Sequence, residues 1–211
     1  MPFQFFNPQA GVTITHGHLP HWDQEGATYF ITWRTADSIP KPVWEQWRLA
    51  RDDWLLAHGI DPAQRDWRRL LENMSEAERR DFRQFTMRLE HEMDSCHGAC
   101  VLRQPALRQI VVDALHFFDA QRYTLGDFVV MPNHVHVLVG SMPREAMLAQ
   151  VESWKRWTAK QINKVIGQHG RFWQDESFDH LVRSEDAFQK FRRYIAENPV
   201  KARLKDTEFT H

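Results

Sequence analysis

Two apolar runs, Tyr123–Met131 and His134–Gly140, most constrain what this 211-residue chain can fold into. Both are rich in β-branched residues and are separated only by Pro132-Asn133, which is typical of two adjacent strands joined by a tight turn. Both runs are too apolar to leave the hairpin bare, so at least one face of it has to be covered. The chain therefore predicts a sheet with helices packed against it.

The segments around this hairpin add further strands and helices. A strand and a helix precede it and a helix and a strand follow it, in the ranges Ala27–Ala36, Pro105–Asp119, Arg144–Ile166 and Ser177–Arg183. Gly167 is placed to end the longer helix. The resulting order is β-α-β-β-α-β, which predicts an α+β fold with a ferredoxin-like core and an antiparallel sheet.

A last helix is expected after the final strand. Ser184 is its predicted N-cap, because a serine side chain can accept from an unpaired amide of the first turn. Glu185 and Asp186 favour the same end, where the helix dipole is positive. Pro199 predicts that the helix ends at Asn198, because a proline disfavours helical backbone at the residue before it.

A polar, helical insertion separates the first strand from the rest of the core. It covers approximately residues 41–95, and Ser75 and Glu78 within it fit a capping box that starts a helix at Glu76. Residues 1–27, rich in Gly, Pro, His and aromatic residues, predict an irregular arm. We expect residues 1–211 to form a single domain that carries this insertion.

Composition excludes several classes of protein. No stretch reaches 18 apolar residues, so no membrane span is expected. The N-terminus has no basic region followed by an apolar one, as a secretory signal would, and there are only two cysteines, which together predict a cytoplasmic protein.

Charge is distributed unevenly along the chain. The net charge is −1, yet residues 144–205 contain 13 Lys and Arg against 8 Asp and Glu. A side that faces a polyanion would use such an excess. The alternative is a chance fluctuation on solvated helices.

The second strand of the hairpin carries the first candidate for chemistry. Residues two apart share one face of a strand, so His134 and His136 project together while Val135 and Val137 point the other way. Two imidazoles on a rigid strand can hold one metal ion. The alternative is a pair of hydrogen-bonded histidines on an exposed face of the sheet.

The last helix carries the second candidate. Tyr194 lies at the edge of its apolar face, and Asn198 follows four residues later on the same side. An amide oxygen is a hard ligand suited to Mg²⁺ or Mn²⁺, and Mn²⁺ also accepts imidazole. Without a ligand, the two residues would be a tyrosine at the edge of the core and an asparagine at a helix end.

The segments MPNHVHVLV and YIAENPVKARL together resemble the single-tyrosine HUH transposases, and within them the REP-associated branch (RAYT). The similarity covers roughly residues 27–40 and 95–205. It implies that His134 and His136 are the metal-binding pair, that Tyr194 is the nucleophile, and that Asn198 is the third protein ligand.

The resemblance also implies a reaction and a partner. Tyr194 would attack a phosphodiester of single-stranded DNA, giving a 5′-phosphotyrosine and a 3′-hydroxyl, with Mg²⁺ or Mn²⁺ at the scissile phosphate. The expected substrates are palindromic hairpins of the REP type, and the expected location is the nucleoid. A monomer is favoured over a homodimer.

Two other functions stay open at this point. A domesticated relative could bind DNA hairpins with little or no cleavage. A nucleotidyl hydrolase of the histidine-triad kind is disfavoured, because Leu138 stands where a third alternating histidine would be needed.

Cationic and aromatic residues near these positions are candidates for contacting DNA. Four cations at helical spacing predict a stripe that contacts phosphates: Lys155, Arg156, Lys160 and Lys164. Three further residues suit unstacked bases and their backbone: Arg171, Trp173 and Arg183. Three more flank the expected nucleophile: Arg192, Arg193 and Lys201. The resemblance extends to Glu176 and His180, for which supporting roles are expected.

Overall fold

The computed structural model describes residues 3–16, 20–64, 67–94, 96–140, 144–175 and 177–211. These residues form two compact units. The first combines residues 1–36 with residues 99–211, and the second is Asp37–Gly98. None of the helices in the described ranges is both long and apolar enough to cross a membrane.

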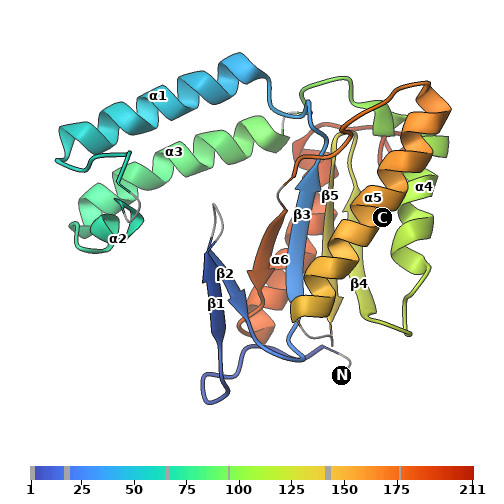
Figure 1. Cartoon of the computed structure of the whole chain (residues 1–211), viewed down its shortest axis with the longest axis horizontal. Helices are drawn as coiled ribbons and strands as arrows, with labels where there is room; N and C mark the ends of the chain where they lie inside the picture. The colour runs from blue at the N-terminus through green and yellow to red at the C-terminus, as the bar shows by residue number, and fades with distance from the viewer. Residues whose placement is uncertain (1–2, 17–19, 65–66, 95, 141–143, 176) are drawn as a thin grey trace. The chain divides into compact units, whose positions relative to one another are not determined.

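The first unit is built on a four-stranded antiparallel sheet (Figure 1). Its strands lie in the order β4 (Thr124–Val130), β5 (His134–Gly140), β3 (Tyr29–Arg34) and β6 (Phe178–Leu181). Helix α4 (Pro105–His116) connects β3 to β4, and α5 (Arg144–Ile166) connects β5 to β6. This is the β-α-β-β-α-β order of a ferredoxin-like core, so the predicted fold class is confirmed.

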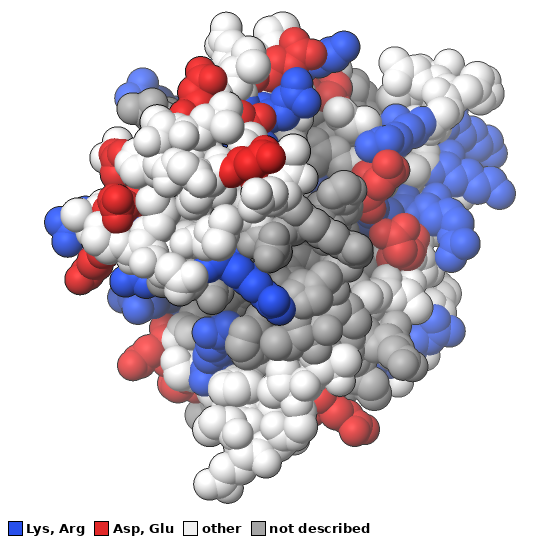
Figure 2. Space-filling model, turned by 60° about the vertical axis from the view of Figure 1, so that its left-hand side comes forward, with Lys and Arg blue, Asp and Glu red and all other residues white. Residues whose placement is uncertain are grey.

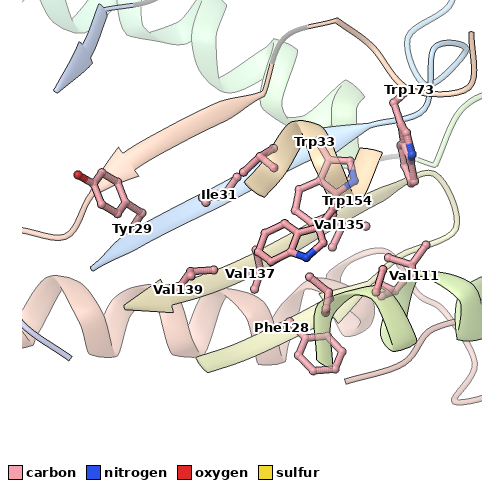
Figure 3. Close-up of a cluster of buried hydrophobic side chains, with 14 of the residues drawn as sticks. Tyr29, Ile31, Trp33, Val111, Phe128, Val135, Val137, Val139, Trp154 and Trp173 are labelled. Atoms are coloured by element: carbon pink, nitrogen blue, oxygen red, sulfur yellow. The ribbon is translucent and has the colours of Figure 1, made fainter. Parts of the chain in front are cut away.

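Neighbouring residues of β3 point to opposite faces of the sheet. Ile31 lies opposite Val137, and Thr32 lies opposite His136. The apolar face is covered by α4 and α5, and its side chains form the main core with Trp154 of α5 (Figure 3). The other face therefore presents the polar members of the same strands.

Helix α6 (Glu185–Lys201) covers that second face. Ser184 caps it as predicted, accepting from the Ala187 amide at 3.2 Å. The ring of Phe191 stacks on Phe30 of β3, with centroids 4.4 Å apart. This contact shows which side of α6 packs against the sheet.

The prediction that α6 ends at Asn198 is wrong. The helix continues through Pro199 to Lys201. A proline this close to a helix end removes one amide donor but leaves the following turn intact, and Ala202 still donates to the Asn198 carbonyl at 3.0 Å. Asn198 therefore lies within the helix and is only 1% exposed.

The prediction of an irregular N-terminal arm is also wrong in part. Strands β1 (Thr13–His16) and β2 (Pro20–Asp23) pair antiparallel. The β-branched run Thr13–Thr15 favours a strand, but the surrounding Gly, Pro and His residues hide so short a signal. Strand β2 approaches β6 within the same unit.

The second unit is the helical insertion. It contains α1 (Lys41–Ala57), α2 (Trp67–Glu72) and α3 (Glu76–Asp94), with Leu55 and Ile60 among its buried residues. The expected capping box is present, because Ser75 Oγ accepts from the Glu78 amide and the Ser75 amide donates to the Glu78 carboxylate. That the two units make one domain stays a prediction.

A buried arginine fastens the C-terminal segment to the first unit. Arg108 of α4 donates to the carbonyls of Leu102, Arg103 and Thr207 and to the Thr210 hydroxyl, at 2.7 to 3.1 Å. Burial lowers the pKa of this guanidinium. Thr210 in turn exchanges backbone hydrogen bonds with Val130 on the outer strand β4. The end of the chain thus covers part of the sheet edge.

We expect Arg108→Leu to lower the free energy of unfolding by about 3 kcal/mol, because several buried acceptors lose a charged donor. Urea unfolding measures the change, and hydrogen exchange at the Val130 and Thr210 amides should accelerate. Arg103→Gln is the control, since its ion pair with Glu208 is partly exposed and worth under about 1 kcal/mol. Equal losses of unfolding free energy in the two variants would contradict the role of Arg108 in holding the C-terminal segment.

Candidate active site

His134 and His136 lie side by side on the face of β5 that α6 covers. Their side chains are 0% and 1% exposed, and the ring centroids are 4.7 Å apart. Both sit inside the sheet because β5 is a central strand, paired with β4 on one side and β3 on the other. The strand alternation predicted from the sequence therefore brings the two rings together.

Each imidazole is held through its Nδ1 atom. His134 Nδ1 lies 2.7 Å from the side-chain oxygen of Asn133, and His136 Nδ1 lies 2.7 Å from Thr32 Oγ1. Both hydrogen bonds are buried. They leave the Nε2 atom of each ring free of these two partners.

Helix α6 brings Tyr194 and Asn198 to the histidines. The Tyr194 ring is 5.0 Å from the His136 ring between centroids, nearly edge-on, and 5.8 Å from Phe30. Asn198 is near enough to His134 for its amide to favour the protonated imidazole. All four residues singled out by the resemblance thus converge, although His136 of β5 and Tyr194 of α6 are 58 residues apart in the sequence.

Tyr194 differs from the other two tyrosines of the chain. Tyr29 and Tyr123 are 0% and 3% exposed, belong to the main core, and donate to the carbonyls of Gln24 and Leu115. Burial raises the pKa of Tyr123. Tyr194 is only partly buried and faces the histidines, so it is the tyrosine placed to meet a substrate there.

Burial and a neighbouring cation keep both imidazoles neutral. Burial lowers the pKa of His134 and of His136 well below the usual value, and the positive charge of Arg34 lowers both further. Arg34 is buried on β3, directly opposite His134. Neutral imidazoles can donate a lone pair to a metal ion at neutral pH.

The donor set suits a small divalent cation. The Nε2 atom of His136 and both amide atoms of Asn198 are buried and make no hydrogen bond with good geometry within the described ranges. Such buried polar atoms are costly unless something else satisfies them. No three His, Cys, Asp or Glu side chains gather in the described part of the chain, so a metal ion here needs the Asn198 oxygen as a ligand.

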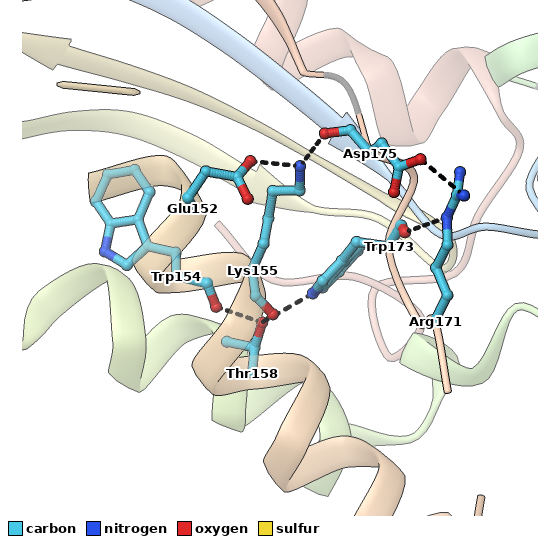
Figure 4. Close-up of polar contacts among 7 residues, drawn as sticks. All are labelled: Glu152, Trp154, Lys155, Thr158, Arg171, Trp173 and Asp175. Carbon is cyan, nitrogen blue, oxygen red and sulfur yellow. Dashed lines mark hydrogen bonds and ion pairs between the residues drawn. The ribbon is translucent and has the colours of Figure 1, made fainter. Parts of the chain in front are cut away.

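Two expected DNA contacts lie inside the protein (Figure 4). The Lys155 side chain is 6% exposed and donates to Glu152 and to the Asp175 carbonyl. Trp173 is 4% exposed and donates its indole N–H to Thr158. The prediction of an exposed stripe is therefore wrong for Lys155, and Trp173 is not a surface platform. Lys155 of α5 is held by the loop that returns from α5 to β6, and Trp173 of that loop is held by Thr158 of α5.

The other predicted DNA contacts are exposed. Lys160 and Lys164 line a hollow at the end of α5 together with Asn163, Gln168 and His169. Arg171 pairs with Asp175, Arg192 with Asp127, and Lys201 with Glu197. Arg156, Arg183 and Arg193 also reach the surface. Figure 2 shows one face of the molecule, on which Lys and Arg side chains gather along the right-hand edge.

Lys201 also lies close to the expected nucleophile. Its ammonium is 5.8 Å from the centroid of the Tyr194 ring. The spacing of seven residues on α6 brings this about, because positions two helical turns apart share a side. The Lys201 ammonium, which also pairs with Glu197, is thereby brought beside the Tyr194 ring.

Sequence reasoning missed four residues of the site: Phe30, Thr32, Arg34 and Asn133. Three of them alternate along β3 and so point toward the histidines. The sequence predicts β3 itself. Which residues its side chains meet depends on its pairing with β5, which the sequence does not show. His180 of β6 lies opposite Phe30, and Glu176 is outside the described residues.

Two solved structures resemble this chain at low identity. A REP-associated tyrosine transposase bound to a REP hairpin shares 15% identity, with a TM-score of 0.41, over 86% of this chain and 71% of the solved one. A candidate transposase of Deinococcus radiodurans r1 shares 15% identity, with a TM-score of 0.32, over 83% and 92%. No curated protein matches the chain.

Residues 104–198 match the family described as Transposase IS200 like. The matched segment begins directly before α4 and ends at Asn198. It therefore contains both histidines of β5 and both site residues of α6. The resemblance to single-tyrosine transposases is confirmed at the level of this family.

Proposed function

Because residues 104–198 match the IS200-like transposase family, we propose that this chain is a metal-dependent single-stranded DNA endonuclease and strand transferase. Its substrates are palindromic hairpins of the REP type, and cleavage proceeds through a 5′-phosphotyrosine. The REP preference rests on the sequence resemblance, and the expected place of action is the nucleoid.

One observation carries this proposal: the Tyr194 ring lies 5.0 Å from His136, in a site that also contains His134 and Asn198. A nucleophile beside a group of neutral nitrogen and oxygen donors is what metal-assisted attack on a phosphodiester requires. A structural tyrosine would not need buried polar atoms around it.

The chemistry conserves bond energy. The Tyr194 oxygen forms a bond to phosphorus as the phenol loses its proton, and the bond from phosphorus to the 3′-oxygen breaks, with that oxygen taking up a proton. Attack by the same or another 3′-hydroxyl reverses the step and releases Tyr194. Cleavage and rejoining therefore need no external energy source.

His134, His136 and the Asn198 oxygen would hold the divalent cation, Mg²⁺ or Mn²⁺, and when bound it supplies positive charge to the scissile phosphate. Lys201, whose ammonium is 5.8 Å from the centroid of the Tyr194 ring, would contact the same phosphate. Burial, and after it the positive charge of Arg34, lowers the pKa of both histidines and so favours the neutral form that ligation requires.

The test is formation of a covalent adduct. The protein is incubated with end-labelled hairpin DNA that carries a single-stranded flank, in Mn²⁺ or Mg²⁺, and resolved under denaturing conditions. We expect a labelled band at the mass of protein plus cleaved DNA, and none in EDTA. Hairpin binding without an adduct would instead support a domesticated binding protein.

A monomer is the proposed active form. Tyr194 faces histidines of its own chain, so no second copy is needed to complete the site. The outer strand β4 is partly covered by the pairing of Thr210 with Val130. Sedimentation at working concentration tests this, and a stable dimer would contradict it.

Lys160 and Lys164 are proposed to contact the DNA backbone. They stand at the end of α5 where the loop to β6 begins, and in that loop the Gln174 amide donates to the Arg34 carbonyl. Arg34 is paired with His134, so this is the end of the sheet that holds the site. Figure 1 shows α5 and β3 ending on the same side.

We expect Lys160→Gln with Lys164→Gln to weaken hairpin binding and to lower the slope of log affinity against log salt by about 1 for each lost phosphate contact. Titration at several salt concentrations measures this. Arg122→Gln is the control, because Arg122 precedes the start of β4, which pairs with the far end of β5. An unchanged slope in the double variant would contradict the contact.

A further inference from the structure

We propose that Thr32 and Asn133 are positioning residues that fix the tautomer of the two site histidines, so that both Nε2 atoms present lone pairs toward Tyr194 and Asn198. This inference rests on the proposed function, since it assigns a purpose to the neutral imidazoles. Neither residue stands out in the sequence as chemically reactive.

For His134 the tautomer follows from the partner. The Asn133 side-chain oxygen can only accept, and it lies 2.7 Å from His134 Nδ1. The proton of the neutral ring must therefore be on Nδ1. A second proton, on Nε2, would put an imidazolium charge in a fully buried position directly across the sheet from the cation Arg34, so Nε2 keeps its lone pair.

For His136 the partner is a hydroxyl, which can donate or accept. Thr32 Oγ1 lies 2.7 Å from His136 Nδ1, and both groups are buried. A proton on Nε2 would leave a buried N–H donor without an acceptor in the described ranges, which is costly. A lone pair on Nε2 is instead the ligand that a metal site needs.

Both positioning groups are rigid. Thr32 sits within β3, between β5 and β6, and its cross-strand partner is His136 itself. Asn133 is the turn residue before β5, and its carbonyl accepts from the Thr35 amide at 2.8 Å. Hydrogen bonds from such fixed groups orient a metal-binding imidazole and set which nitrogen is available.

Long-range ¹⁵N NMR of histidine-labelled protein in EDTA reads the tautomers directly, with His134→Gln and His136→Gln to assign the two rings. We expect both protons on Nδ1. In Thr32→Val we expect His136 to shift toward the Nε2–H form while His134 is unchanged. A wild-type ring protonated on Nε2, or no change at His136 in Thr32→Val, would overturn the inference.

The second measurement is Mn²⁺ affinity by titration. We expect Thr32→Val and Asn133→Ala each to weaken binding by about 10- to 100-fold. Thr32→Ser and Asn133→Asp, which retain an acceptor, should restore most of it. Thr28→Val is the matched control, because Thr28 is also a buried threonine directly before β3, and its hydroxyl has no hydrogen-bond partner in the described ranges.

The two measurements separate this inference from the proposed function. If the wild-type tautomers are as expected but the wild-type protein binds no Mn²⁺, the tautomer assignment stands and the metal-dependent function is overturned. If the wild type binds Mn²⁺ and Thr32→Val binds it as tightly, the positioning role is overturned while the function stands.

Discussion

Tyr194→Phe is expected to abolish the covalent DNA adduct while leaving hairpin binding intact. The substitution removes only the hydroxyl that would form the bond to phosphorus, and the ring that contacts Phe30 and His136 stays. Loss of a nucleophile that acts by covalent catalysis lowers the rate by several orders of magnitude, on the order of 10³-fold or more. The adduct should therefore fall below detection.

The measurement is a time course of adduct formation with labelled hairpin, run beside a gel-shift titration of the same variant. Tyr123→Phe is the matched control, since it removes a hydroxyl that only donates to the Leu115 carbonyl in the main core. It should form the adduct as the wild type does. A covalent adduct that still forms with Tyr194→Phe would contradict the proposed mechanism.

The second large effect is expected for His136→Ala. Removing this imidazole takes away a donor of the proposed metal site whose ring lies 5.0 Å from that of Tyr194. We expect the rate of adduct formation at fixed Mn²⁺ to fall by about 10²- to 10³-fold, the usual cost of losing one group that stabilises transition-state charge. Raising Mn²⁺ should recover part of the loss.

His180→Ala supplies the comparison for this variant. His180 lies on β6, opposite Phe30 and on the same face of the sheet, and its ring is 5.2 Å from Phe191. It should change the rate far less than His136→Ala. Circular dichroism must show both variants folded. Comparable losses in the two variants would mean that the face needs histidines for packing and not for metal binding.

The parts of the site that were predictable share one property: each depends on the period of a single element. Alternation along β5 put His134 and His136 on one face, and the four-residue spacing of α6 put Tyr194 beside Asn198. The order of strands and helices then implied the sheet. All of these follow from local geometry that the sequence records.

What could not be predicted depends on neighbours far away in the chain. The exposure of Lys155 is decided by a backbone carbonyl twenty residues later, at Asp175. In the sequence Thr32 is one of several β-branched residues of a strand. Only the pairing of β3 with β5 shows that it lies opposite His136. Pro199 failed as a stop signal because the turn after it finds other hydrogen bonds. Pairing and burial, which no local pattern contains, made the difference.

The two sides of β5 have consequences for how this protein can change over generations. The side chains of Val135, Val137 and Val139 are buried in the main core. The two histidines belong to the same seven-residue strand. A bulkier side chain at one of these valines costs about 1–3 kcal/mol and shifts the backbone, which would carry the rings with it. Drift in the interior of the fold therefore reaches the chemistry directly.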